Sequence, residues 1–285
     1  MRTALLILLL GLPLLTLADS LDELLASGEL DIQTSITPAQ GAVPGQHMRL
    51  TIEVATQRWF SGGTRIRLPE APGLIILQTD QFAANASERR GATTWVIQRW
   101  GLDIFPQRAG SFTVPPVELQ IQVNTAAGNV SGSTQTEALS FEVVMPAALE
   151  EAESWVAAPR FTADQALDRE ATELAVGDAL RQTVTFRAED VQAMMLPTLE
   201  AAAPAGLKAY RSPPELDNRN DRGTMRATRR EEITYIAEQA GTYRLPPQEY
   251  YWWNTARGEL ELVSIPAVDI TVAAGQAGVV RVACQ

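Results

Sequence analysis

The sequence predicts an all-β protein in which two tandem immunoglobulin-like antiparallel β-sandwich domains follow a signal peptide. Two observations support this prediction. Many short segments alternate apolar and polar residues with a period of two, which is typical of half-buried strands, and turns rich in glycine or proline separate them. The same landmarks also occur twice in the same order, so the chain contains a repeat about one domain long.

The clearest repeated landmark is a glycine turn, a short aromatic segment and a double proline, which neither a helix interior nor a central strand could hold. Its two copies contain Gly110 and Gly241, which are 131 positions apart (241 − 110). Upstream, alternating segments follow Gly45 and Gly177, which are 132 positions apart (177 − 45). A further match in the same order is Leu68-Pro69 with Leu196-Pro197. We therefore predict two copies of one domain.

Residues 1–18 have the pattern of a cleavable signal peptide. A single early cation, Arg2, precedes an apolar run that ends with the small residue Ala18. The run is too short for a comfortable membrane span, although an uncleaved anchor helix is the alternative. No later stretch reaches the ~20 apolar residues that a span needs. We therefore expect an exported, periplasmic protein without a transmembrane helix in the mature chain. Any association with the membrane is expected to occur through its partners.

The charge and cysteine content exclude several classes of protein. The chain has 23 Lys plus Arg and 34 Asp plus Glu, a formal charge of −11; removal of Arg2 with the signal peptide leaves 22 against 34, or −12. Such an acidic chain is not expected to bind nucleic acid or anionic membrane surfaces, which both recruit cations. Because Cys284 is the single cysteine, no disulfide can form within the chain, and buried cores must provide the stability.

The mature chain divides by composition. The acidic lead-in carries Leu21, Leu24 and Leu25 at helical spacing, and we interpret it as one or two solvated helical turns. The alanine- and glutamate-rich linker is interpreted as a short helix that Pro159 stops. The predicted segments are residues 1–18 (signal peptide), 19–28 (lead-in), 29–146 (first β-sandwich domain), 147–159 (linker), 160–273 (second β-sandwich domain) and 274–285 (C-terminal tail).

Strands are predicted wherever the alternation is clear. Between two of them, residues 211–222 are polar and rich in turn formers, which predicts a mobile loop. Within the following strand, Arg229 and Glu231 fall on the side that is otherwise apolar, which suggests a bulge. The predicted strands include residues 48–54, 119–123, 139–143, 181–187, 224–236, 249–254, 259–263 and 268–272.

An aromatic segment stands out in the second predicted domain. If it is a strand, Tyr250 and Trp252 point to one face while Tyr251 and Trp253 point to the other. One pair can fill the core, and the other must pack against the neighbouring domain, a partner or solvent. Because aromatic residues are enriched at interface hot spots, we predict that Tyr250, Tyr251, Trp252 and Trp253 form a partner-binding edge. The alternative is that a loop or the first domain covers the outer pair.

Residues that could perform catalysis are scarce. The single histidine, His47, has no second histidine for a zinc site and begins an alternating strand, so we interpret it as a surface or strand-edge residue. No glycine-rich phosphate loop precedes a helix. The carboxylates of Glu150, Glu151 and Glu153 are interpreted as a solvated connector. We therefore predict a protein that is not an enzyme, with no catalytic residues, no cofactor and no metal.

A set of turn and aromatic motifs runs through both predicted domains. In the first domain the motifs are residues 57–60, Gly110-Ser111-Phe112 and Pro115-Pro116. In the second domain they are Gly177-Asp178, Leu196-Pro197, residues 210–214, residues 233–236, Gly241-Thr242-Tyr243, residues 245–247 and Trp252-Trp253-Asn254. With these motifs the chain resembles the BatD family of bacterial oxygen-tolerance proteins. The resemblance covers nearly all of the mature chain, and its motifs carry no catalytic signature.

The resemblance implies a non-enzymatic envelope adaptor or scaffold linked to aerotolerance and envelope stress. BatD-type proteins are encoded alongside membrane proteins with von Willebrand factor A domains and a MoxR-type AAA+ ATPase. The resemblance therefore implies that the von Willebrand factor A proteins are direct partners and that the ATPase is an indirect one. Many members continue into a C-terminal transmembrane helix, and this sequence departs from them by ending before one. The family's membrane attachment is therefore not transferred.

Two other classes of function stay open. A carbohydrate-binding or carbohydrate-cleaving β-sandwich would use Tyr251, Trp252 or Trp253 as a sugar-stacking platform beside acidic residues. A metal-assisted adhesion module would need converging acidic and amide oxygens. The only dense candidates for that second alternative are Asp217, Asn218, Asn220 and Asp221, which are also ordinary turn formers.

Overall fold

The computed structural model describes residues 20–274 with the exception of residue 222. Regular structure in these residues is nearly all β and forms several antiparallel sheets, which confirms the predicted all-β class. Its description as two immunoglobulin-like domains stays a prediction, as do the domain boundaries. The predicted signal peptide, Cys284 and all of the predicted tail except residue 274 lie outside the described residues. No helix among the described residues is long and apolar enough to cross a membrane.

The first half of the chain contains one α-helix and eleven strands among the described residues. Their bounds are α1 (Leu21–Ala26), β1 (Leu30–Thr37), β2 (Met48–Thr56), β3 (Trp59–Phe60), β4 (Arg65–Arg67), β5 (Leu74–Leu77), β6 (Ala84–Arg90), β7 (Thr93–Pro106), β8 (Gly110–Val114), β9 (Glu118–Thr125), β10 (Gly128–Gln135) and β11 (Leu139–Val143).

The second half contains two short 3₁₀ turns and eleven further strands among the described residues. Their bounds are η1 (Ala147–Leu149), β12 (Val156–Ala158), β13 (Phe161–Leu167), β14 (Leu174–Ala175), β15 (Ala179–Glu189), η2 (Ala193–Met195), β16 (Leu207–Arg211), β17 (Glu215–Asp221), β18 (Thr224–Ala237), β19 (Gly241–Leu245), β20 (Gln248–Asn254), β21 (Glu259–Ile265) and β22 (Val268–Ala273).

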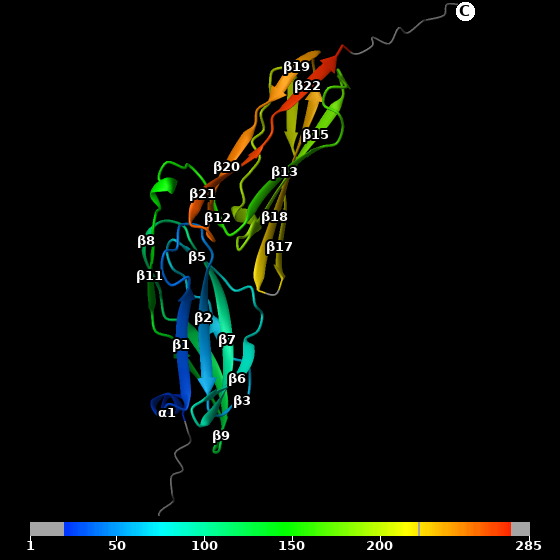
Figure 1. Cartoon of the computed structure of the whole chain (residues 1–285). Helices are drawn as coiled ribbons and strands as arrows, with labels where there is room; N and C mark the ends of the chain where they lie inside the picture. Colours follow the sequence, from blue (N-terminus) through cyan, green and yellow to red (C-terminus); the bar gives the residue numbers. More distant parts are fainter. Residues whose placement is uncertain (1–19, 222, 275–285) are drawn as a thin grey trace, which may run out of the picture.

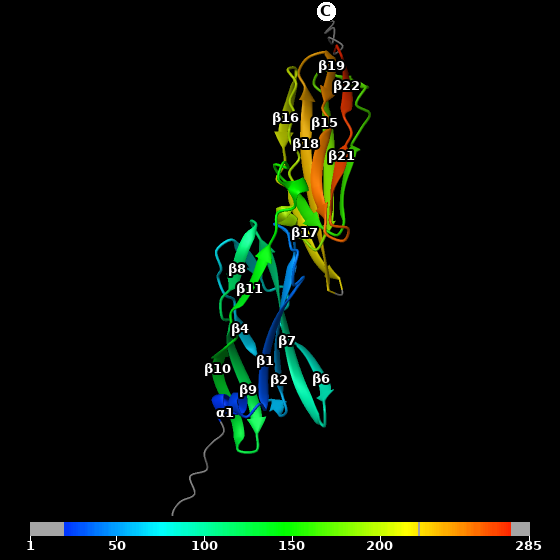
Figure 2. The same ribbon diagram turned by 60° about the vertical axis from the view of Figure 1, so that its left-hand side comes forward.

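Buried hydrophobic residues form two main clusters. One draws on residues 21–143, which we call the N-terminal unit, and the other on residues 156–272, which we call the C-terminal unit. Figure 1 and Figure 2 show these units as two elongated β bodies joined end to end. The hairpin of β17 and β18 extends from the C-terminal unit toward the N-terminal unit in both views.

The larger sheet has the same strand order in the two units. One sheet has the order β1-β2-β7-β5 with β6 also on β7 in the N-terminal unit, and β13-β15-β18-β16 with β17 also on β18 in the C-terminal unit. The opposing pairs β9–β10 and β8–β11 correspond to β20–β21 and β19–β22. Gly110 and Gly241 begin β8 and β19 with φ of 122° and 158°, values that favour glycine. The sequence repeat is therefore also a repeat of strand order.

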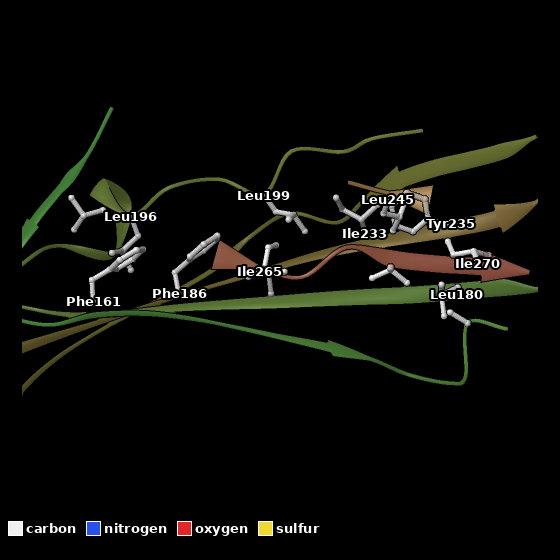
Figure 3. Packing of buried hydrophobic residues seen from close by; sticks show 14 of the residues in the cluster. Phe161, Leu180, Phe186, Leu196, Leu199, Ile233, Tyr235, Leu245, Ile265 and Ile270 are labelled. Atoms are coloured by element: carbon white, nitrogen blue, oxygen red, sulfur yellow. The ribbon is translucent and has the colours of Figure 1, made fainter. Parts of the chain in front are cut away.

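Alternating side chains of the facing sheets fill each core. In the C-terminal unit, Leu180 and Phe186 of β15 are fully buried and point between the layers (Figure 3). Val184 of the same strand is also fully buried. The rings of Phe161 and Phe186 stack with their centroids 6.2 Å apart, and Tyr250 meets Phe186 edge-on at 4.9 Å. These aromatic contacts connect the core to β20, which carries the predicted partner-binding residues.

The acidic lead-in contains the predicted helix but is not solvated. Helix α1 begins with a reciprocal capping box between Ser20 and Glu23, which satisfies two otherwise unpaired backbone N–H groups. Leu21 and Leu24 are buried and belong to the core of the N-terminal unit. The interpretation as a solvated segment is wrong because the spaced leucines close one side of the sandwich.

The linker is not the predicted helix. Only η1, a single 3₁₀ turn, is helical, and residues 156–158 form strand β12, which pairs in parallel with β20. All three residues of β12 are buried, so packing against β20 outweighs the helix preference of alanine. Trp155, just before β12, donates its indole N–H to the Pro44 carbonyl oxygen at 3.1 Å and so ties the linker to the N-terminal unit.

The prediction of a loop at residues 211–222 is also wrong for the residues that the structure describes, which exclude residue 222. This segment includes β17, whose residues are all exposed and which pairs with β18 in regular antiparallel register. The predicted bulge is not on β18 either, because its register with β15 is continuous. Instead, register shifts by one residue between β16 and β17, where Pro213 and Pro214 lack the N–H groups that a ladder requires.

Candidate functional site

A cleft of about 610 Å³ lies beside the N-terminal half of β20 in the C-terminal unit. It brings together the start of β12, the loop that contains η2, and β20 itself, so segments about 50 and 100 positions apart in sequence share one surface. Both Tyr250 and Tyr251 line it. The remaining lining residues are Ser154, Trp155, Val156, Met194, Met195, Leu196, Pro197, Thr198, Glu200, Arg229, Pro247, Gln248 and Glu249.

The four predicted partner-binding residues do not share one environment. The side chains alternate as predicted: Trp252 is 6% exposed in the core and Tyr250 packs against that core, while Tyr251 is 42% exposed and Trp253 is half-buried on the other face. Only Tyr250 and Tyr251 line the cleft. Trp252 therefore acts as a core residue of the C-terminal unit, and Tyr251 is the ring best placed to meet a partner.

Trp252 offers a test of this core assignment. Its indole Nε1 is buried without a hydrogen-bond partner among the described residues, whereas Trp100 Nε1 donates to the Thr64 carbonyl oxygen at 3.2 Å. We expect Trp252→Phe to change the free energy of unfolding by less than about 1 kcal/mol, because the lost packing is offset by removal of an unpaired donor. The matched variant Trp100→Phe is expected to cost about 1–2 kcal/mol, because it leaves an acceptor unpaired. Urea unfolding of both variants checks this, and a larger loss for Trp252→Phe would contradict it.

The η2 loop forms one wall of the cleft and is held in place by polar contacts. The Gln248 side chain donates to the Glu200 carbonyl oxygen at 2.8 Å and accepts from the Glu200 N–H at 3.0 Å. Arg211 donates through Nη2 to the Leu199 carbonyl oxygen. On this wall, the Met194 side chain is 67% exposed, which supplies a flexible apolar contact surface at the mouth of the cleft.

A buried ion cluster lies behind the cleft. Glu231 is fully buried, and its Oε1 accepts a hydrogen bond from Arg229 Nε at 2.7 Å. The Nη2 of Arg229 also lies 2.7 Å from this oxygen and completes the ion pair. Arg211 Nη1 lies 3.4 Å from Glu231 Oε2. The two residues that broke the apolar pattern of β18 are therefore partners of each other. Through Arg211 this cluster connects the core face of β18 to the η2 loop.

The phenol of Tyr250 is held in its neutral form. Burial raises the pKa of Tyr250 above its ordinary value of 10.0, and the negative charges of Glu200 and Glu231 raise it further. The neutral hydroxyl donates to Gln248 Oε1 at 2.8 Å. Tyr250 therefore supports the same glutamine that holds the η2 loop, and it contributes shape and a fixed hydroxyl to the cleft rather than acid–base chemistry.

Negative charge dominates the exposed rim of the cleft. Glu200 and Glu249 are both exposed, and neither forms an ion pair with any other described residue. The one cation in the lining, Arg229, is already neutralised by Glu231. A segment that binds here therefore meets two free carboxylates, an aromatic ring and a methionine.

A second, polar cleft of about 590 Å³ is lined by residues of both units, including Asn220 and Met225 of the β17–β18 hairpin. At its base Asp103 is only 1% exposed and accepts three hydrogen bonds: from Arg49 Nη1 at 2.7 Å, from the Thr79 hydroxyl at 2.6 Å and from the His47 ring at 2.8 Å. Asp190 and Asn220 of the C-terminal unit face this cluster across the cleft. His47 does lie at a strand edge, but its ring is mostly buried, so its interpretation as a surface residue is wrong.

The His47 cluster does not have the geometry of a nucleophile and base. Both His47 and Thr79 hydrogen-bond to Asp103, which stands between them, so the hydroxyl has no contact with the imidazole. The third alternative from the sequence fares no better: Asp217 pairs with Arg219, while Asn218 and Asn220 accept backbone N–H groups. Among the described residues, no three His, Cys, Asp or Glu side chains are grouped to hold a metal ion.

The described residues form an all-β protein with two clefts, and sequence comparison adds no family to that fold class. No protein-family model matches this sequence, and no curated protein matches it significantly.

Sequence reasoning found Tyr250 and Tyr251 but missed the other side of the cleft. Met194 and Glu200 lie in the unpatterned stretch between two predicted strands, where no periodicity distinguishes a cleft wall from a solvated loop. The one signal in the sequence is the repeat itself: relative to the repeated Leu-Pro landmark, Ala193–Met195 stands where the first copy has Arg65–Arg67. The second copy replaces two arginines by alanine and methionine, and that exchange marks the site.

Proposed function

We propose that this protein is a non-enzymatic periplasmic adaptor of the oxygen-tolerance (Bat) type. In this proposal it binds membrane proteins with von Willebrand factor A domains, which are linked to a MoxR-type AAA+ ATPase in envelope stress tolerance. The β20 cleft is the binding surface. The single observation that carries the proposal is the exposed pair of Tyr251 and Met194 on opposite walls of a cleft that contains no nucleophile and base in contact.

Several properties of the cleft support binding of a protein. Aromatic rings provide contact area with little loss of conformational freedom, and methionine provides a contact surface of adaptable shape. Both are enriched at protein interfaces. Hydrogen bonds from Gln248 and Arg211 to the η2 loop support the cleft. Its walls are therefore fixed in position before a partner binds. A preformed surface lowers the ordering cost of association.

The test is a crosslinking pull-down of the mature protein from its own envelope fraction. Wild-type protein is expected to recover von Willebrand factor A proteins, and the Tyr251→Ala plus Met194→Ala variant is expected to recover them at least about tenfold less well. The matched control is Trp59→Ala, which removes a ring that is 73% exposed on β3 of the N-terminal unit, outside the cleft. Equal recovery by all three proteins would remove the cleft from this role, and the absence of such partners would contradict the adaptor function.

The alternative is a carbohydrate-binding or carbohydrate-cleaving protein, and Tyr251 beside Glu249 is the observation that favours it. Trp252 cannot serve as its sugar platform because the ring lies in the core. Titration of the mature protein with envelope glycan fragments tests this function. Saturable binding that Tyr251→Ala abolishes, together with failure of the pull-down, would favour the carbohydrate function over the adaptor.

A further inference from the structure

The equivalent strands β9 and β20 are paired differently at one edge in the two units. In the N-terminal unit, β4 pairs antiparallel with the start of β9, with Arg65 opposite Gln120, Ile66 opposite Leu119 and Arg67 opposite Glu118. At the repeat offset of 131, these three positions of β9 correspond to Tyr251, Tyr250 and Glu249 of β20 (for example, 118 + 131 = 249). β4 therefore fills in one unit the place that the cleft occupies in the other.

The C-terminal unit lacks a strand equivalent to β4 among its described residues. The corresponding segment forms the 3₁₀ turn η2 instead, which does not pair with β20, and its Met194 and Met195 line the cleft. On this side β20 is paired only by β12, which begins opposite Trp252. Residues 248–251 of β20 therefore have no neighbouring strand at this edge among the described residues, and an unpaired edge is a template for another strand.

Backbone direction agrees with this. The Thr255 N–H donates to the Ala158 carbonyl oxygen of β12, and alternate residues of a strand direct their backbone groups to the same side. The backbone groups of Glu249 and Tyr251 therefore face the cleft. In the N-terminal unit the Ser61 N–H bonds to the Gln122 carbonyl oxygen, so Glu118 and Gln120 of β9 face β4 by the same rule.

We propose, building on the adaptor function above, that the β20 cleft accepts a short extended segment of a partner protein that alternates basic and aliphatic residues. The segment adds to β20 as an antiparallel strand in the position that β4 has on β9. Within this protein β4 is already paired with β9, so the segment comes from another protein. This mode of recognition uses backbone hydrogen bonds for affinity and alternate side chains for specificity.

The side chains of β4 show why a basic segment fits. Arg67 Nη1 lies 3.7 Å from Glu118 Oε2, whereas Glu249, the counterpart of Glu118, has no ion-pair partner among the described residues. The central aliphatic residue, like Ile66, packs toward the core, here against Tyr250 in the place of Leu119. A second basic residue of the segment lies over the exposed ring of Tyr251 and forms a cation–π contact with it. In the N-terminal unit the equivalent residue, Arg65, lies opposite Gln120.

The test uses as its probe a labelled peptide copy of residues 63–69, acetyl-Gly-Thr-Arg-Ile-Arg-Leu-Pro-amide, with binding to the mature protein followed by fluorescence anisotropy. We expect it to bind about tenfold more tightly than the same peptide with both arginines replaced by glutamate. Methylation of the backbone nitrogens of the two arginines keeps the charge but removes the strand hydrogen bonds, and is also expected to weaken binding about tenfold. Glu249→Lys is expected to weaken binding by a similar factor. The control Glu142→Lys, an equal charge change at an exposed position of β11, is expected to leave affinity unchanged.

Hydrogen exchange gives a second measurement. Bound peptide is expected to slow exchange of the Tyr251 and Glu249 amides, which face the cleft, and to leave the Tyr250 amide, which faces β21, unchanged.

Equal affinity of the basic, acidic and methylated peptides, or no binding at about 1 mM, would overturn the proposal. Peptide-competed self-association of the protein would also overturn it, by assigning the edge to a second copy. If the pull-down succeeds while the peptide fails, the adaptor function stands and only strand addition is lost.

Discussion

Glu231→Ala is expected to lower the free energy of unfolding of the C-terminal unit by about 3 kcal/mol. The substitution removes the fully buried carboxylate that pairs with Arg229 and Arg211, and leaves the guanidinium of Arg229, which is itself largely buried, without its counter-charge. Urea unfolding followed by tryptophan fluorescence measures the loss. Because Arg211 also holds the Leu199 carbonyl of the η2 loop, we expect that loop to exchange its amides faster in the folded variant.

Its neighbour Glu232 provides the matched control. Glu232 lies on the opposite face of β18 and forms partly exposed ion pairs with Arg181 and Arg230. We expect Glu232→Ala to cost less than about 1 kcal/mol, because exposed ion pairs contribute little. Equal losses for the two variants would mean that the Glu231 cluster has no special role in stability. An unchanged η2 loop in the Glu231 variant would separate the cluster from the cleft wall.

Asp103→Asn is expected to lower the free energy of unfolding of the N-terminal unit by about 3 kcal/mol at neutral pH. The amide cannot accept hydrogen bonds at both of its termini, so at least one of the donors on Arg49, Thr79 and His47 loses its partner. The exposed Asp80, which pairs with the same Arg49 at 2.6 Å, is the control. Asp80→Asn is expected to cost less than about 1 kcal/mol.

The Asp103 effect also has a defined pH dependence. Burial alone would raise the pKa of Asp103, but the hydrogen bonds from His47, Thr79 and Arg49 lower it below its ordinary value of 3.8. A carboxyl group with a lowered folded pKa stabilises the protein above its unfolded pKa, and that stabilisation is lost as pH falls through the folded pKa. The difference in stability between wild type and Asp103→Asn should therefore shrink below about pH 3.8. A difference that grows on acidification would contradict this assignment.

The sequence by itself determined the all-β class and five of the eleven described strands of the C-terminal unit. Period-two alternation located β15, β18, β20, β21 and β22 to within a few residues, because each has one face against the core and the other toward solvent. It also determined the repeat, and the glycines that mark it begin equivalent strands with positive φ. The alternation of Tyr250, Tyr251, Trp252 and Trp253 followed from the same periodicity.

Segments whose state depends on distant partners could not be read in this way. β12 is a strand because β20 offers it a parallel edge, and β17 is a strand because β18 continues beyond β16. Glu231 looked like an error in the pattern of β18, because the periodicity does not show that Arg229 of the same strand and Arg211 of β16 both pair with it. Likewise, His47 has no local signal that connects it to Asp103, which is 56 positions away.

The cleft shows this division most clearly. The aromatic residues on β20 were visible in the sequence, but the cleft exists only because η2 departs from the edge that β4 occupies in the other copy. Local periodicity specifies which face of a strand is buried, since each residue contributes its own apolar surface. Whether the edge of that strand is paired depends on a segment distant in sequence, and only the tertiary structure decides it.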